Sequence, residues 1–105
     1  MKSKKSRKTL QAVIDHYGAD HQLAKTVEEL TELIHVIARR QQSGVMWEST
    51  ALFEEMADVY VMLDQLKLIC CAEMDITLQE FNNVLDSHKR AKIKRTIQRM
   101  QEEKQ

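Results

Sequence analysis

The sequence predicts an all-α protein: a helical bundle of about four helices per chain, assembled through its central helices into an oligomer. Three observations predict this fold class. The 105 residues include no proline and only two glycines, so few positions interrupt a helix. Hydrophobic residues recur at intervals of three and four, the spacing of one helix face. A content of 43% hydrophobic and 30% charged residues is typical of a folded chain rather than a disordered one.

A chain of this length fits one domain spanning residues 1–105, with a frayed basic arm at 1–8 and a polar tail at 100–105. The formal net charge of zero does not favour nucleic acid as a partner. No hydrophobic run is long enough to cross a membrane, and no hydrophobic block follows the basic start as in a signal peptide. We therefore expect a cytoplasmic protein in which Cys70 and Cys71 are free thiols.

The first two helices are separated by Gly18, a residue that commonly ends helices. We expect the first helix over residues 9–17. The second begins after Asp20, a suitable N-cap, and runs to about residue 40. Its hydrophobic residues are spaced by four and three and form one stripe expected to face the core: Leu23, Val27, Leu30, Ile34 and Ile37.

The third and fourth helices are expected over residues 49–73 and 77–101. Hydrophobic residues cover most of the circumference of the third helix, which predicts that it is buried on all sides. A small chain cannot bury it alone, so a partner subunit is expected to do so, in a homodimer or homotetramer. The fourth helix opens with Thr77 and Glu80 in the spacing of a capping box.

Two acidic signatures carry most of the functional information. Glu29 and Glu32 are three residues apart on the second helix, and Glu55 and Asp58 repeat this spacing on the third. Each pair therefore points one way and borders the hydrophobic residues of its helix. If the two helices pack together, these carboxylates converge, and such a cluster is costly unless a cation neutralises it. Oxygen ligands favour Mg²⁺ or Mn²⁺, and such an ion suggests a phosphate-bearing substrate.

The pattern Glu28-Glu29-x-x-Glu32, a linker of 22 residues and then Glu55-x-x-Asp58 resembles the MazG-like all-α nucleoside triphosphate pyrophosphohydrolases. The resemblance covers roughly residues 17–99 and is similar to the short single-domain members of bacteria and phages. It implies hydrolysis of a nucleoside or deoxynucleoside triphosphate to the monophosphate and pyrophosphate. The cellular role it implies is cleaning of the nucleotide pool.

By matching position, the resemblance implies that four acids bind Mg²⁺ and carry the catalysis: Glu29, Glu32, Glu55 and Asp58. Glu28 would orient the first of them or act through water. The resemblance and the composition of the chain together suggest substrate-binding residues, of which Lys92 and Arg95 are favoured for the phosphates: Gln22, Lys25, Trp47, Asn83, Lys92 and Arg95. Trp47 either stacks on the base or anchors the loop before the third helix.

Hydrolysis at the α-phosphorus requires an activated water and neutralisation of the charge on the polyphosphate. A carboxylate-held Mg²⁺ provides both. Four carboxylates exceed what one such ion usually takes from a protein, so two or more ions per site are expected. Glu29 or Glu32 is the expected proton acceptor.

Three other interpretations compete with this one. In the first, the acids form solvated helix faces paired with lysine and arginine. Glu32-x-x-His35 occurs in di-iron carboxylate bundles, but Asp58 stands where a second histidine would be needed. A non-catalytic helical partner with a nucleic-acid-binding tail would use Arg90, Lys94 and Arg99, although no aromatic residues interleave with them.

Overall fold

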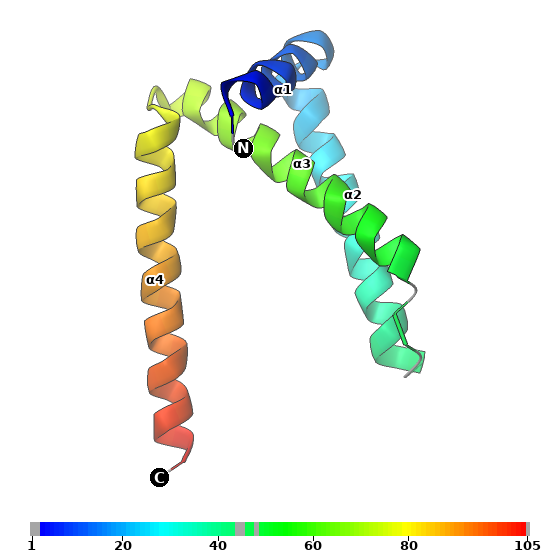
Figure 1. Cartoon of the computed structure of the whole chain (residues 1–105), viewed down its shortest axis with the longest axis vertical. Coiled ribbons are helices and arrows are strands. Elements are labelled where there is room, and N and C mark those ends of the chain that lie inside the picture. The colour runs from blue at the N-terminus through cyan, green and yellow to red at the C-terminus, as the bar shows by residue number, and fades with distance from the viewer. Residues whose placement is uncertain (1–2, 44–45, 48, 105) are drawn as a thin grey trace. The chain divides into compact units, whose positions relative to one another are not determined.

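The computed structural model describes residues 3–43, 46, 47 and 49–104 (Figure 1). Over these residues the chain forms four helices and no strand: α1 (Lys4–Tyr17), α2 (Ala19–Ser43), α3 (Ser49–Met74) and α4 (Leu78–Glu103). The all-α class and the number of helices are thus confirmed. No helix within the described ranges has the length and hydrophobicity needed to cross a membrane.

The helix α1 begins five residues before the predicted start. The side chain of Ser3 accepts a hydrogen bond of 3.1 Å from the backbone N–H of Ser6, which caps the helix and draws the basic residues 4–8 into it. Gly18 ends α1 as predicted, with φ of 92° and its N–H bonded to the carbonyl of Ile14 at 2.7 Å. Because α2 starts at Ala19, Asp20 lies in the first turn and is not the N-cap, a correction to the sequence prediction.

The capping box at the start of α4 is confirmed. The hydroxyl of Thr77 accepts a hydrogen bond from the backbone N–H of Glu80, and the carboxylate of Glu80 accepts one from the backbone N–H of Thr77, both at 3.1 Å. These two bonds satisfy amide groups that have no partner inside the helix. The helix start is therefore fixed by local sequence.

The chain divides into two compact units, residues 1–70 and 71–105. In the first unit, α1, α2 and α3 share a small hydrophobic core. Ile14 of α1 packs with Leu68 and Ile69 of α3, and Leu10, Ala19 and Leu23 pack against them. This core lies at the end of α2 that is near Gly18, so it holds the beginning of α2 against the later turns of α3.

The face of α2 that is buried within the chain differs from the predicted one. Four residues of α2, spaced so that they share one face, are buried: Gln22, Thr26, Glu29 and Val36. The amide of Gln22 donates a hydrogen bond of 2.7 Å to Gln65 of α3, across the helix pair. The predicted core stripe is instead largely exposed, with Val27 64% and Ile34 60% accessible, because polar side chains occupy the contact with α3.

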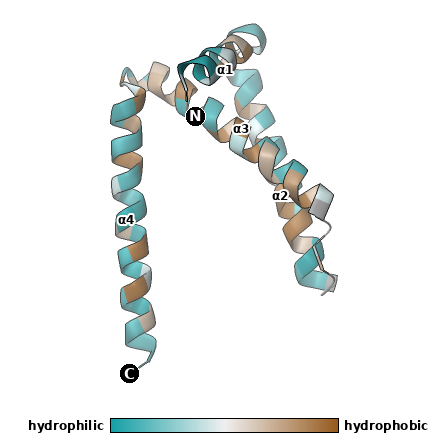
Figure 2. Cartoon of the chain, in the orientation of Figure 1, coloured by the Kyte–Doolittle hydropathy of each residue, from teal (hydrophilic) through white to brown (hydrophobic). Residues whose placement is uncertain are grey.

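The second unit contains the last turn of α3 and the helix α4. No residue of α4 is buried. Hydrophobic residues alternate with hydrophilic ones along this helix (Figure 2), and several large hydrophobic side chains are accessible: Val84, Leu85, Ile93, Ile97 and Met100. The helix thus presents a mixed surface with many cations among its hydrophobic residues.

Candidate metal centre

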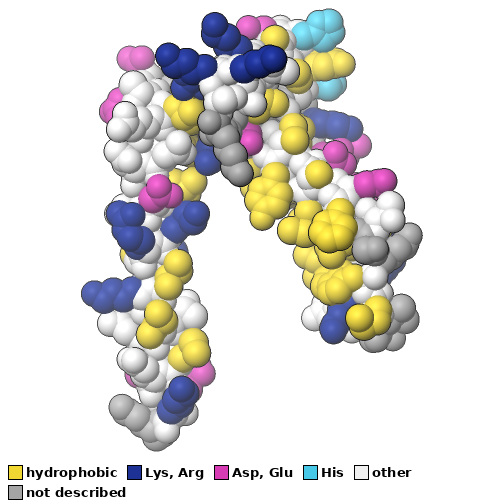
Figure 3. Space-filling view, in the orientation of Figure 1, with side chains coloured by type: hydrophobic (Ala, Val, Ile, Leu, Met, Phe, Trp, Pro, Cys, Tyr) yellow, Lys and Arg dark blue, Asp and Glu magenta, His cyan; other side chains and the backbone are white. Residues whose placement is uncertain are grey.

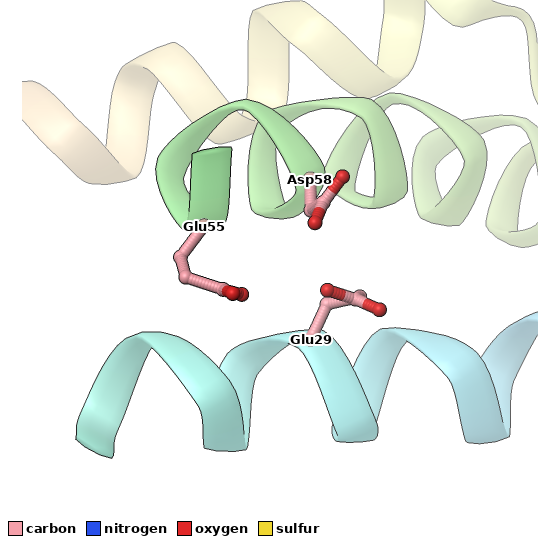
Figure 4. A group of neighbouring side chains, drawn as sticks. All are labelled: Glu29, Glu55 and Asp58. Atoms are coloured by element: carbon pink, nitrogen blue, oxygen red, sulfur yellow. The ribbon is translucent and has the colours of Figure 1, made fainter. Parts of the chain in front are cut away.

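Three carboxylates meet between α2 and α3. Glu29 extends from α2 toward α3, and Glu55 and Asp58 extend from successive turns of α3 toward α2 (Figure 4). One carboxylate oxygen from each lies within 4.8 Å of the others. The three-residue spacing of Glu55 and Asp58 puts both on the same side of α3, as the sequence predicted. The geometry is a group of three acids that could hold a metal ion.

This group is partly withdrawn from water. Glu29 is only 8% exposed. The Oε2 atom of Glu55 is buried and has no hydrogen-bond partner among the described residues. A buried carboxylate oxygen without a partner is costly, since it has lost its hydration without compensation. A divalent cation would supply the missing interaction, so the residues present fit such an ion.

The electrostatics of Glu55 lead to the same conclusion. Burial raises the pKa of its carboxyl above the ordinary value of 4.5, and the negative charges of Glu29, Asp58, Glu32 and Glu54 raise this pKa further, in that order. The protein therefore holds a carboxylate whose charged form is disfavoured both by the loss of solvation and by the repulsion of neighbouring charges. A bound cation would favour the charged form of Glu55 and so lower this pKa.

Lys25 compensates part of this negative charge. Its ammonium group lies 3.3 Å from Glu29 and 3.5 Å from Glu28, one turn earlier on α2. The hydrogen bond to Glu29 is the largest cause of the raised pKa of Lys25, followed by the charges of Glu28 and Glu29. Lys25 is therefore an immediate neighbour of the cluster. Glu28 is exposed and is linked to the cluster by its contact with Lys25.

Glu32 does not belong to the group of three acids. It is exposed and lines a separate groove on α2 with His35 and Arg39. On a helix it lies about 60° around from Glu29, so it turns away from α3. Its charge still contributes to the raised pKa of Glu55, which places it beside the cluster. Of the four predicted ligands, the structure thus brings three together and leaves the fourth at the edge.

The predicted substrate-binding residues fall in different places. Gln22 is 4% exposed and its amide is bonded to Gln65, so its observed contacts are internal. Trp47 is 41% exposed, and the guanidinium of Arg40 lies 5.9 Å from the centre of its ring. This contact is a cation–π pair between α2 and the loop that follows it. Lys25 contacts Glu29, as described above. The other three predicted residues lie on α4, in the second unit: Asn83, Lys92 and Arg95.

Two residues near the cluster were not singled out from the sequence. Thr26 and Gln65 are 5% and 3% exposed, and they complete the buried polar surface between α2 and α3. Thr26 donates a hydrogen bond to the carbonyl of Gln22 at 2.8 Å. The available signal was the spacing of Gln22, Thr26 and Glu29 by four and three, which marks one face of α2 as polar.

Comparisons with protein-family models, with curated proteins and with solved structures gave no match to this chain. The resemblance to the MazG-like pyrophosphohydrolases therefore stays a prediction from the sequence pattern.

Proposed function

We propose that this protein is a Mg²⁺-dependent nucleoside triphosphate pyrophosphohydrolase, which converts its substrate to the nucleoside monophosphate and pyrophosphate. The observation that supports it most directly is the meeting of Glu29, Glu55 and Asp58, where a buried carboxylate oxygen of Glu55 has no hydrogen-bond partner in the described part of the chain. This geometry supports binding of a divalent cation, with Mn²⁺ as a substitute for Mg²⁺. The choice of reaction comes from the MazG-like pattern of the two signatures.

In the proposed reaction, a water oxygen forms a bond to the α-phosphorus while the bond from that phosphorus to the bridging oxygen breaks. When bound, Mg²⁺ supplies charge neutralisation and lowers the pKa of a coordinated water. Glu29, Glu55 and Asp58 would hold the ion. Lys25, through its ion pair of 3.3 Å, orients the Glu29 carboxylate.

Glu32 is the better of the two predicted proton acceptors. The group of three acids includes Glu29, whose oxygen would be engaged by a cation, whereas Glu32 lies beside the group and is exposed. A carboxylate at the edge of the cluster that does not bind the ion keeps its oxygens available to take the proton of the attacking water. We propose this role for Glu32.

The proposed enzyme is a homodimer or homotetramer. The exposed hydrophobic residues of the first unit include Val27, Ile34, Phe53 and Tyr60, each at least 60% accessible. Figure 3 shows hydrophobic side chains gathered over α2 and α3 on one face. Surfaces of this kind mark interaction sites, since each square ångström removed from water contributes about 25 cal/mol.

The experiment that tests the activity is a panel of ribo- and deoxyribonucleoside triphosphates incubated with Mg²⁺ or Mn²⁺, with pyrophosphate and orthophosphate scored separately. We expect pyrophosphate and the nucleoside monophosphate as the products, and loss of turnover when EDTA removes the ion. Release of orthophosphate alone would place the cleavage at another bond and contradict the proposal. Absence of turnover with every nucleotide would also contradict it.

A further inference from the structure

The groove on α2 that Glu32 lines is separate from the group of three acids. This groove of about 450 Å³ lies along the helix and is lined by Glu32, His35, Ala38, Arg39 and Gln42. It is open to solvent along one side of the helix. All five residues come from the first unit, and all but Ala38 carry polar groups that can meet a ligand.

One end of the groove is acidic and the rest carries hydrogen-bond donors. Glu32 stands at the acidic end, and its charge contributes to the raised pKa of Glu55. Arg39 follows Glu32 by seven residues, which is about 10 Å along a helix at 1.5 Å per residue. His35 lies between them, and Gln42 extends the lining by another turn. The side chains thus pass from an acid beside the metal centre to hydrogen-bond donors farther away.

We propose that this groove binds the β- and γ-phosphates of the substrate, the part released as pyrophosphate, through Arg39, His35 and Gln42. The inference rests on the proposed function, since it needs the α-phosphate to lie at the acid cluster. A guanidinium donates several hydrogen bonds in a planar arrangement that matches phosphate oxygens, and imidazole and amide N–H groups add donors of shorter reach. The small side chain of Ala38 leaves room between them.

The groove stays open in the proposed oligomer. With Glu29 as the origin and about 100° per residue, the exposed hydrophobic stripe of α2 spans about 80° to 160°. The groove residues span about 180° to 300°, on the other flank of the helix. A second copy that covers Val27, Leu30 and Ile34 therefore leaves Arg39 and Glu32 accessible to a ligand.

The experiment compares Arg39→Gln with Arg7→Gln, which removes the same kind of side chain from α1, away from both the cluster and the groove. The probe is inorganic tripolyphosphate in the presence of Mn²⁺. Its binding is measured by titration calorimetry, and Mn²⁺ binding alone is measured by electron paramagnetic resonance. We expect R39Q to weaken tripolyphosphate binding and raise KM by about tenfold, the effect of losing a charge-assisted hydrogen bond, with Mn²⁺ affinity unchanged.

His35→Gln gives a second variant, which we expect to weaken tripolyphosphate binding by a smaller factor. If R39Q and R7Q bind tripolyphosphate equally and have equal KM, the phosphate assignment of the groove is overturned, even if the protein hydrolyses nucleotides. If no nucleotide is hydrolysed but R39Q still weakens binding of tripolyphosphate with Mn²⁺, the groove is supported as a polyphosphate site and the proposed reaction fails.

Discussion

Glu55 is the residue whose environment conflicts most with its charge. Its Oε2 atom is buried without a hydrogen-bond partner among the described residues, and the charges of four other acids raise its pKa. Because its folded-state pKa exceeds the ordinary value of 4.5, the folded state binds more protons than the unfolded state between these two values. The contribution of this carboxyl to stability is therefore present below the unfolded-state pKa and is lost as pH rises through the folded-state pKa.

The substitution Glu55→Gln tests this account. We expect the metal-free variant to be more stable than the wild type at pH 7, because an amide has no charge to desolvate, and the difference to shrink as pH falls toward 4.5. We also expect its Mn²⁺ affinity to fall by about tenfold or more, since a charged ligand is lost. Urea denaturation across pH 4 to 8, with and without Mn²⁺, measures both effects. Parallel stability curves for the two proteins would contradict this account of Glu55.

Substituting Asp64, which lies outside the two signatures, with Asn gives a matched removal of one carboxylate from the same helix. We expect D64N to retain the Mn²⁺ affinity of the wild type. An equal loss of Mn²⁺ affinity in D64N and E55Q would show that the ion responds to the total charge of α3 and not to the cluster.

At the scale of single helices, the sequence predicted where helices end and begin, but it assigned the wrong buried face to α2. The stops and starts at Gly18 and Thr77 depend on local hydrogen bonds, so they could be predicted from neighbouring residues. The orientation of α2 about its own axis could not be predicted in this way. The regular spacing of Leu23, Val27 and Leu30 predicts a buried stripe, but periodicity does not say whether the same chain or another one covers it.

In the candidate site, too, one feature could be predicted from the sequence and another could not. The spacing of Glu55 and Asp58 on one helix sets their common direction, and this was predictable. The placement of Glu32 depends on how α2 is rotated about its axis relative to α3. That rotation puts Gln22, Thr26 and Glu29 against α3 and turns Glu32 toward the groove. The packing of polar residues between α2 and α3 determines this rotation, and sequence patterns give little information on such packing.

The hydrogen bond between Gln22 and Gln65 is the buried polar link that fixes this rotation. We expect Gln65→Leu to lower the free energy of unfolding by about 1–3 kcal/mol, because the amide of Gln22 then loses its buried partner. We expect the double substitution Q22L/Q65L to recover most of this loss, since two hydrophobic side chains of similar size replace the pair. Urea denaturation of the single and double variants measures the coupling. Simple additivity of the two single effects would show that the two amides act independently.

At the scale of the whole molecule, the first unit buries polar residues of α2 and α3 together with a few hydrophobic ones, and it exposes many other hydrophobic residues. Its buried hydrophobic core near Gly18 is small, with Ile14, Leu68 and Ile69 as its buried members. A small core leaves little free energy to offset the entropy lost on folding. The outward hydrophobic surface of α2 and α3 can supply more only by association, which links folding to assembly.

Association is therefore expected to depend on the exposed stripe of α2, and Ile34→Glu tests it. A glutamate there would have to lose its hydration inside the interface, so we expect the variant to dissociate at micromolar concentration, with a Kd for assembly raised about 100-fold or more. Sedimentation equilibrium measures this change. Ala24→Glu, an exposed position of α2 on another side of the helix, adds the same charge and should keep the assembly intact.

The metal centre provides the second measurement on the same variants. Because Glu29, Glu55 and Asp58 come from one chain, a folded but dissociated I34E should still bind Mn²⁺. Circular dichroism establishes that the variant remains helical. A monomeric wild type at 100 µM would contradict the assembly, and the exposed hydrophobic stripe would then need another partner. Loss of Mn²⁺ binding on dissociation of a helical I34E would mean that the second copy supports the acids, and that the contact between α2 and α3 is too weak to keep them together alone.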